Sequence, residues 1–184
     1  MPNKPLVVAV GGTLRPNSST ERVLDAVLAQ ARERGAETKL FCGQAINFPI
    51  YLPGNAAAEP AVTEFIDTLR RADAIVLGSP GYHGGVSGLV KNAIDYTEEM
   101  ANDPAPYFSN KPVGCVATGF GWQGCNATLQ GLRTIVHSLR GWPTPIGIAL
   151  NTKTPFLDDA GVCINRELAT QIGVMVEQLL ARWA

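Results

Sequence analysis

Hydrophobic residues along this chain gather in five short continuous runs, and between the runs they recur every three or four positions. The five runs are Leu6–Val10, Lys39–Cys42, Ala72–Gly78, Pro112–Ala117 and Ile146–Leu150. Continuous runs of this length are typical of strands buried in a sheet, whereas a period of three to four residues predicts amphipathic helices. One predicted helix ends at Gly35, another begins at Pro60, and a third closes the chain from Leu168 to Leu180.

The alternation of strands and helices predicts a parallel sheet with right-handed crossovers and helices on both faces. Five strands suit the doubly wound, flavodoxin-like order 2-1-3-4-5. A chain of 184 residues is long enough for one hydrophobic core. We therefore expect one α/β domain over residues 1–184.

The composition indicates an ordinary soluble globular protein, with 46% hydrophobic residues and a net charge of -1. This balance argues against nucleic acid as a partner, because a broad basic surface is lacking. The apolar run at the N-terminus is too short for a signal peptide, and no run reaches membrane-spanning length. The sequence thus predicts a cytoplasmic protein without a membrane partner.

The four cysteines are widely spaced and form no CxxC pair, which argues against a metal site or a disulfide. Cys125 follows Gly124 at a predicted helix start, where a thiolate is favoured. A structural and a redox role are both open for Cys125.

The first strand ends at Gly11 and Gly12 and leads into a segment rich in hydrogen-bond donors. Its side chains are those of Thr13, Arg15, Asn17, Ser18, Ser19 and Thr20. The first amides of the helix that follows are unpaired and favour an anion. One hypothesis is that this segment binds a phosphate; the alternative is that Ser18 or Ser19 merely caps the helix.

Two further loops follow the third and fourth strands, Ser79–Gly88 and Thr118–Cys125. The carboxyl ends of parallel strands meet at one edge of the sheet, which is where ligands bind in such folds. Gly119 to Gly124 also matches GxGxxG, but no acidic residue lies between Pro104 and Leu157 to bind a ribose. We interpret that match as coincidental, and the lack of a Walker A motif argues against an NTPase.

The stretch without acids contains four basic residues, Lys111, Arg133, Arg140 and Lys153. One hypothesis is that they make the binding edge positive and attract an anionic dinucleotide. The alternative is an ordinary solvated face.

Three motifs together resemble the NADPH-dependent FMN reductase family, which has a flavodoxin-like fold and includes related quinone and azo-dye reductases. They are Gly12–Thr13–Leu14–Arg15–Pro16–Asn17–Ser18, the segment from Pro80–Gly81–Tyr82–His83 to Lys91–Asn92–Ala93–Ile94–Asp95, and Thr118–Gly119–Phe120–Gly121–Trp122–Gln123–Gly124. The resemblance implies bound FMN, with NADPH or NADH as electron donor. It also implies a quinone, flavin or azo compound as acceptor, and a homodimer or homotetramer.

The resemblance also implies which residues hold FMN, with no metal and no catalytic side chain, because hydride transfer takes place on the flavin itself. The first loop would bind the phosphate, Tyr82 would stack on or border the ring, and the third loop would offer backbone amides. The implied residues are Thr13, Arg15, Asn17, Ser18, Ser19, Thr20, Pro80, Gly81, Tyr82, His83, Gly84, Thr118, Gly119, Gly121 and Gly124.

This chain departs from the family pattern in the second motif, where Gly81 replaces Glu, His83 replaces Asn and Ser87 replaces Pro. His83 is either a donor to the flavin or a bound quinone, or an exposed loop histidine. Tyr82 could instead simply cover the end of the sheet. Two other functions stay open for the whole chain, an FMN-binding electron carrier and a flavin-binding regulator.

Overall fold

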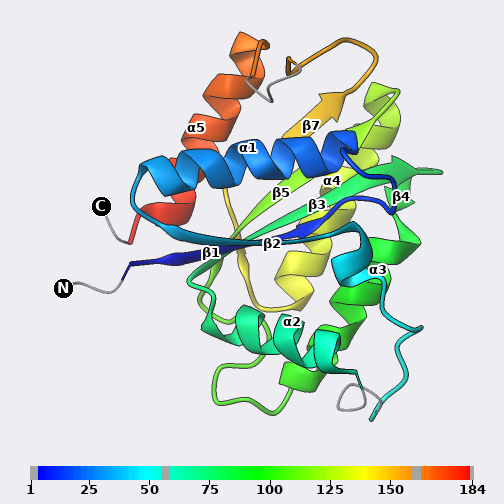
Figure 1. Cartoon of the computed structure of the whole chain (residues 1–184), viewed down its shortest axis with the longest axis vertical. Coiled ribbons are helices and arrows are strands. Elements are labelled where there is room, and N and C mark those ends of the chain that lie inside the picture. The colour runs from blue at the N-terminus through cyan, green and yellow to red at the C-terminus, as the bar shows by residue number, and fades with distance from the viewer. Residues whose placement is uncertain (1–3, 55–58, 159–162, 183–184) are drawn as a thin grey trace.

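The computed structural model describes residues 4–54, 59–158 and 163–182, which form a central sheet between two layers of helices (Figure 1). The parallel strands are β1 (Leu6–Gly11), β2 (Glu37–Cys42), β3 (Ala74–Tyr82), β5 (Pro112–Gly119), β6 (Trp142–Pro143) and β7 (Ile148–Asn151). Their order is β2-β1-β3-β5, with β6 and β7 both beside β5. The doubly wound α/β fold predicted from the sequence is therefore confirmed.

The last position of the sheet is filled by two short pieces, which is where the observed strand order differs from the simple 2-1-3-4-5 pattern. The predicted strand Ile146–Leu150 corresponds to β7, and β6 precedes it outside the predicted range. β6 pairs with the start of β5 at Pro112 and Val113, and β7 pairs with its end, from Val116 to Gly119. Between the pieces, Pro145 lacks the amide that a continuous ladder would need. The Thr144 hydroxyl donates instead to the Ile146 carbonyl at 2.7 Å and closes a local turn.

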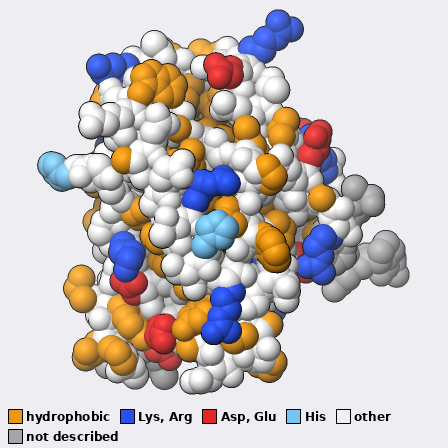
Figure 2. All heavy atoms as spheres, turned by 180° about the vertical axis from the view of Figure 1, so that it is seen from behind, with side chains coloured by type: hydrophobic (Ala, Val, Ile, Leu, Met, Phe, Trp, Pro, Cys, Tyr) orange, Lys and Arg blue, Asp and Glu red, His pale blue; other side chains and the backbone are white. Residues whose placement is uncertain are grey.

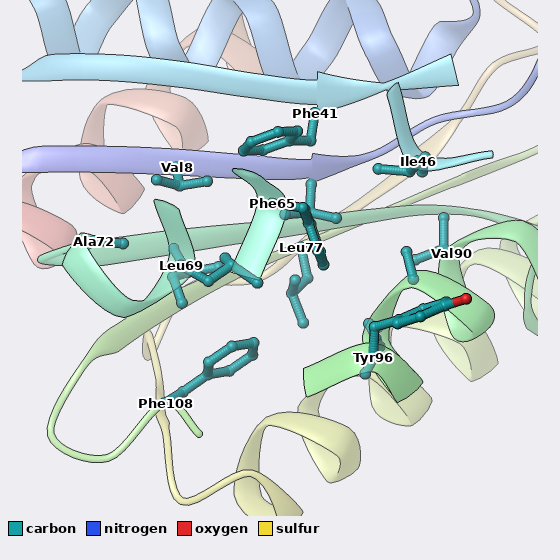
Figure 3. Close-up of a cluster of buried hydrophobic side chains, with 14 of the residues drawn as sticks. Val8, Phe41, Ile46, Phe65, Leu69, Ala72, Leu77, Val90, Tyr96 and Phe108 are labelled. Atoms are coloured by element: carbon teal, nitrogen blue, oxygen red, sulfur yellow. The ribbon is translucent and has the colours of Figure 1, made fainter. Parts of the chain in front are cut away.

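Helices cover both faces of the sheet and bury separate apolar clusters. On one face lie α1 (Ser19–Glu33) and α5 (Arg166–Leu180); on the other lie α2 (Pro60–Arg71), α3 (Gly88–Asp95) and α4 (Trp122–Ser138). Residues of β1 alternate between the clusters, since Val7 faces α1 and α5 whereas Val8 faces α2. Figure 3 shows the second cluster, where Phe65 and Leu69 of α2 point toward Val8 and Phe41 of the sheet.

The predicted helix boundaries at Gly35 and Pro60 are confirmed. Gly35 has φ +87, the left-handed conformation that ends a helix at low cost for glycine. Its neighbour Ala36 donates its amide to the Ala31 carbonyl at 3.1 Å. Pro60 is the first residue of α2, where a missing amide does no harm.

The loop predicted over Ser79–Gly88 is wrong in part, because β3 continues to Tyr82 and folds back as a hairpin. Its return strand is β4 (Gly85–Val86), paired antiparallel with Gly81 and Tyr82. Between the strands, His83 has φ 51 and Gly84 has φ 83. Positive φ at both central residues is typical of a type I′ turn, whose twist matches that of a hairpin.

The predicted loop over Thr118–Cys125 is also shorter than expected, because β5 runs to Gly119 and α4 begins at Trp122. Only Phe120 and Gly121 separate the strand from the helix.

The long segment after β2 is held in place by one side chain of α3. It begins as a 3-10 helix, η1 (Gly43–Ile46), and then runs alongside α3. The Asn92 Oδ1 atom accepts the Tyr51 amide at 2.8 Å, and its Nδ2 atom donates to the Pro49 carbonyl at 2.9 Å. Asn92, part of the second motif, therefore has a structural role.

In the described segments of the chain no helix has the length and apolar character needed to cross a membrane.

Candidate active site

The carboxyl ends of β1, β3 and β5 meet at a cavity of about 450 Å³. Its wall consists of Thr13, Arg15, Ser18, Ser19, Thr20, Pro80, Gly81, Tyr82, His83, Gly84, Thr118, Gly119, Phe120, Gly121, Gln123, Gly124 and Thr152. Every site residue expected from the sequence belongs to this wall except Asn17. The volume is in the range of sites for small molecules and cofactors, which span roughly 300–1,000 Å³.

The opening loop is shaped by the close approach of its backbone to neighbouring strands. A β-carbon on Gly11 would collide with the backbone of Gly78 in β3, and one on Gly12 would collide with the Cys42 sulfur. The Thr13 hydroxyl accepts the Arg15 amide at 3.1 Å and tightens the turn. Glycine is therefore required where this loop leaves the sheet.

Ser18 is the N-cap of α1, because its hydroxyl accepts the Glu21 amide at 3.3 Å. The capping alternative is thus confirmed for Ser18, although its side chain also lies in the cavity wall. Asn17 has φ 54 and stays outside the wall. Asparagine is among the few residues that tolerate this left-handed conformation, which accounts for Asn17 in the turn.

Two buried hydroxyls join the opening loop to β5 at the base of the cavity. The oxygens of Thr20 and Thr118 lie 2.7 Å apart, and both side chains are almost fully buried. Only one of the two protons can occupy the space between the oxygens. The hydroxyl that accepts this proton keeps its own, which is available to a ligand in the cavity.

The β3–β4 hairpin is packed tightly against α4, and this explains why glycine replaces glutamate at position 81. A β-carbon there would lie 2.8 Å from the Thr128 hydroxyl and 3.0 Å from the Gly124 carbonyl. The Thr128 hydroxyl also donates to the Gly85 carbonyl at 3.2 Å. Tyr82 and His83 are carried at the tip and are exposed to solvent, Tyr82 to 55%.

The amino end of α4 faces the cavity without a side-chain cap. A β-carbon on Gly121 or Gly124 would meet no atom within 4 Å, so packing does not require glycine at either position. Glycine there leaves the backbone amides of the first turn open to a ligand.

Cys125 is buried behind this turn, and its thiol donates to the Leu150 carbonyl at 3.2 Å. Burial raises the pKa of the Cys125 thiol, which opposes formation of the thiolate. The structure therefore supports a structural role for this cysteine over a redox role.

Three residues of the wall, Phe120, Gln123 and Thr152, were not expected from the sequence. Phe120 and Gln123 belong to the third motif, but no feature of the sequence marks either side chain as part of a site. Thr152 directly follows β7, and its amide donates to the Gly119 carbonyl at 2.8 Å. Because parallel strands end at one edge of the sheet, Thr152 could have been predicted as a site residue from the end of the fifth strand. The sequence did not mark that end clearly.

The hypothesis of a positive binding edge is wrong for three of the four basic residues. Lys111 precedes β5 at the opposite end of the sheet, Arg133 donates to the Thr144 carbonyl at 2.9 Å, and Arg140 lies 5.5 Å from the centre of the Tyr107 ring. Figure 2 shows basic side chains dispersed over the face seen from behind, several of them beside acidic ones. Of the four, Lys153 alone is next to a residue of the cavity wall, Thr152.

Arg15 nevertheless gives the cavity a positive character. Among the described residues no Asp or Glu belongs to its wall, and Arg15 is the one residue there with a permanent charge. The amino ends of α1 and α4, which lie on opposite faces of the sheet, both add partial positive charge at this edge. A cavity of this kind suits an anionic ligand.

Comparisons with known proteins agree with this chemistry. Residues 5–154 match the model of the NADPH-dependent FMN reductase family. An FMN-dependent NADPH-azoreductase from Staphylococcus saprophyticus is 38% identical over 114 residues, which are 61% of this chain and 57% of that protein. The chain thus spans little more than half the length of that relative.

Solved structures with low sequence identity share the fold. The flavoenzyme NAD(P)H:(acceptor) oxidoreductase FerB from Paracoccus denitrificans superposes with a TM-score of 0.79 at 20% identity, over 96% of this chain and 98% of that one. A flavodoxin from Streptococcus pneumonia superposes with a TM-score of 0.63 at 16% identity, over 96% and 99%. The flavodoxin-like fold is confirmed, and FMN and NADPH, expected from the motifs, are named in the family's description. This chain belongs to the NADPH-dependent FMN reductase family.

Proposed function

We propose that the cavity binds FMN and that the chain catalyses transfer of reducing equivalents from NAD(P)H through FMN to a small acceptor, a quinone, a free flavin or an azo compound. One observation carries the proposal: the three motifs that suggest a flavin site lie far apart in the sequence and line one cavity. We further propose that the protein acts in the cytoplasm as a homodimer or homotetramer with one domain in each chain.

The phosphate end of FMN fits the opening loop. Arg15 offers a guanidinium, Ser19 and Thr20 offer hydroxyls, and the amino end of α1 offers unpaired amides. These groups can pair with a monophosphate and donate hydrogen bonds to it without the lysine of a nucleoside triphosphate site. The absence of carboxylates from the described wall removes the main source of repulsion.

The ring of FMN fits the other end of the cavity. Gly121 and Gly124 keep the amides of α4 accessible, and Tyr82 provides an aromatic surface. When bound, FMN supplies the hydride chemistry that none of the surrounding side chains can provide. The amino end of α4 favours negative charge at this place, which is what reduction of a flavin creates.

The visible spectrum of the purified protein, followed by anaerobic addition of NADPH, tests the proposal. A yellow protein that bleaches rapidly with NADPH supports an NAD(P)H-dependent enzyme. A yellow protein that NADPH leaves oxidised would instead indicate the electron carrier or the regulator. The net charge of -1 argues against the carrier, because such proteins are commonly acidic where they dock on basic partners.

A further inference from the structure

The β3–β4 hairpin lies against one face of α4, and this face is made of small residues (Figure 1). Gly124, Thr128 and Gly131 are spaced by four and three residues and therefore share one side of the helix. A β-carbon on Gly131 would lie 3.7 Å from the Val86 side chain of β4. At the other end of the face, a β-carbon on Gly81 would lie 3.0 Å from the Gly124 carbonyl. The hairpin thus contacts the whole length of this face.

Thr128 is the residue of this face that has a polar side chain, and it is fully buried. Its hydroxyl donates to the Gly85 carbonyl at 3.2 Å. In the antiparallel ladder, Gly85 lies directly opposite Tyr82. The Thr128 hydroxyl therefore acts on Tyr82 through the ladder, by holding the residue across from it.

The base of the hairpin is closed separately, by the buried hydroxyl of Ser79. It accepts the Ser87 amide at 2.9 Å and donates to the Pro80 carbonyl at 2.8 Å. Among the described residues, Thr128 provides the one side chain outside the hairpin that forms a hydrogen bond with residues 80–86. The position of the hairpin tip relative to α4 depends on this bond more than on the base.

The same helix also borders the proposed site of the flavin ring. Gly124 belongs to the cavity wall together with Tyr82, and Thr128 follows Gly124 by one turn. The separation between the first amides of α4 and Tyr82 is therefore set by the contact of Thr128 with the hairpin. Gly81 allows this contact, because a β-carbon there would lie 2.8 Å from the Thr128 hydroxyl.

We propose that Thr128 is a positioning residue for the flavin, because its hydroxyl fixes the hairpin on α4 and thereby places Tyr82 beside the ring. Thr128 itself lies outside the cavity wall and acts through Gly85 and the ladder. This inference rests on the proposed function, since a position for Tyr82 matters to a flavin only if the cavity binds one.

Removal of the hydroxyl at constant shape tests the inference by flavin affinity. Thr128→Val should weaken FMN and riboflavin alike by about fivefold, which corresponds to the loss of one neutral hydrogen bond. Both flavins are affected because they share the ring. Thr128→Ser keeps the hydroxyl and should restore the affinity. Unchanged affinity in Thr128→Val, or a loss confined to FMN, overturns the inference.

A double-mutant cycle with Tyr82 separates positioning from a general loss of structure. In a protein that carries Tyr82→Leu, the additional change Thr128→Val should alter flavin affinity less than about twofold, because the group that Thr128 places is already absent. If Thr128→Val weakens flavin equally with and without Tyr82→Leu, Thr128 does not act through Tyr82.

Hydrogen exchange of the flavin-free protein tests the anchor without any ligand. Amides of residues 80–86 should exchange about fivefold faster in Thr128→Val and at the wild-type rate in Thr128→Ser. Exchange that is the same in Thr128→Val and the wild type contradicts the anchor. If Thr128→Val fails to fold, Thr128→Ala removes the same hydroxyl without adding volume and repeats both measurements.

Thr134→Val is the matched control on the same helix. The Thr134 hydroxyl is exposed and donates to the Gln130 carbonyl at 3.0 Å within α4. Its loss should change neither flavin affinity nor the exchange of the hairpin amides. Equal effects of Thr134→Val and Thr128→Val would show that the helix as a whole responds, and would overturn the inference.

Failure of the inference can be distinguished from failure of the proposed function. If the proposed function fails, the wild-type protein takes up no FMN or leaves it oxidised with NADPH. If only the inference fails, the wild-type protein carries FMN that NADPH reduces, and Thr128→Val binds both flavins as tightly as the wild type does.

Discussion

The two ends of the parallel sheet use similar residues for opposite purposes. At the amino end, the Lys111 ammonium donates to the carbonyls of Leu69, Arg70 and Ala72 at 3.0, 2.8 and 2.5 Å, and the Asp73 carboxylate accepts the Leu6 amide at 2.9 Å. At the carboxyl end, the Arg15 guanidinium and the first amides of α4 are left for a ligand. Charged groups thus close the fold at one end, whereas at the other end Arg15 lines an open cavity.

This comparison teaches that a basic residue cannot be assigned to a binding site by its sequence neighbourhood alone. Lys111 and Arg140 share an acid-free stretch with the site residues, yet both have structural partners. What decides the role is whether the fold already satisfies the charge. Substitutions at the two ends should therefore separate ligand affinity from stability.

The largest effect is expected from removing the proposed phosphate contacts at the carboxyl end. Arg15→Ala combined with Ser19→Ala should weaken FMN about 100-fold, because charged and hydroxyl donors to a phosphate are both lost. Riboflavin, which lacks the phosphate, should bind as before. Fluorescence titration with both flavins measures the difference.

Ser19 is preferred to Ser18 for this double variant because Ser18 caps α1 and its loss would also destabilise the helix. The unfolding midpoint of the double variant should match that of the wild type. A parallel loss of riboflavin and FMN affinity would contradict the assignment of this loop to the phosphate.

The next effect is expected at the amino end. Lys111→Met should lower the free energy of unfolding by about 2 kcal/mol, since three carbonyls lose a charged donor. FMN affinity should not change, because Lys111 is at the far end of the sheet. Urea denaturation and flavin titration of the same sample check both statements.

Lys91→Met is the matched control for Lys111→Met. Its ammonium pairs with Asp95 at 2.6 Å on an exposed helix surface, where such pairs contribute about 0.5 kcal/mol. Equal losses of stability in the two variants would show that the three hydrogen bonds of Lys111 stabilise the protein no more than an exposed ion pair does.

A third variant should move affinity and stability in opposite directions. Gly124→Ala should raise the free energy of unfolding by about 0.5–1 kcal/mol, because alanine favours a helix and meets no neighbour there. FMN should bind about tenfold more weakly, since the new methyl group obstructs the amides of α4. Thermal unfolding with and without FMN measures both changes.

Gly81→Ala provides the contrast for Gly124→Ala. Its new methyl group would lie 2.8 Å from the Thr128 hydroxyl, so this variant should be less stable than the wild type even without flavin.

If Gly124→Ala keeps full FMN affinity, the amides of α4 do not contact the cofactor.

The smallest effect concerns the centre of the sheet and depends on pH. Burial raises the pKa of the Cys115 thiol to about 12, compared with about 8.5 in an unfolded chain. Above about pH 8.5 the unfolded chain loses this proton while the folded protein keeps it. The contribution of the Cys115 thiol to the free energy of unfolding therefore falls as the pH rises. Between about pH 7.5 and 9.5 the loss should be about 1 kcal/mol.

Cys115→Ala should remove this part of the pH dependence, which urea denaturation at the two pH values can measure. The other titrating groups are common to both proteins and cancel in the comparison. A variant with the same slope as the wild type would show that the thiol does not stay protonated in the folded state.

The sequence was sufficient for the layers of the fold, because the apolar patterns of strands and helices are local. It was also sufficient for the cavity wall apart from Phe120, Gln123 and Thr152, because motifs at the ends of parallel strands share one edge. The β3–β4 hairpin was missed because β4 has only two residues and its glycine- and serine-rich sequence resembles a loop. Its pairing depends on contact with α4, which no local pattern reveals.

The role of Lys111 could not be predicted for a related reason. Its carbonyl partners lie about 40 residues earlier in the chain, with separations of 42, 41 and 39 residues. The pairing of β3 with β5, in which Ile75 lies opposite Val113, brings them together. Contacts of this kind depend on tertiary structure, and a single sequence gives no direct signal for them.

The broken edge strand also limits how this protein can associate with itself. β6 and β7 offer only two and four residues at one edge, and β2 at the other edge carries Glu37 and Lys39. Short pieces and charged residues discourage another chain from adding a strand, which is the usual route to uncontrolled aggregation of sheet proteins. An oligomer of this protein would therefore be built from helix and loop surfaces, and the sheet of each subunit would remain separate.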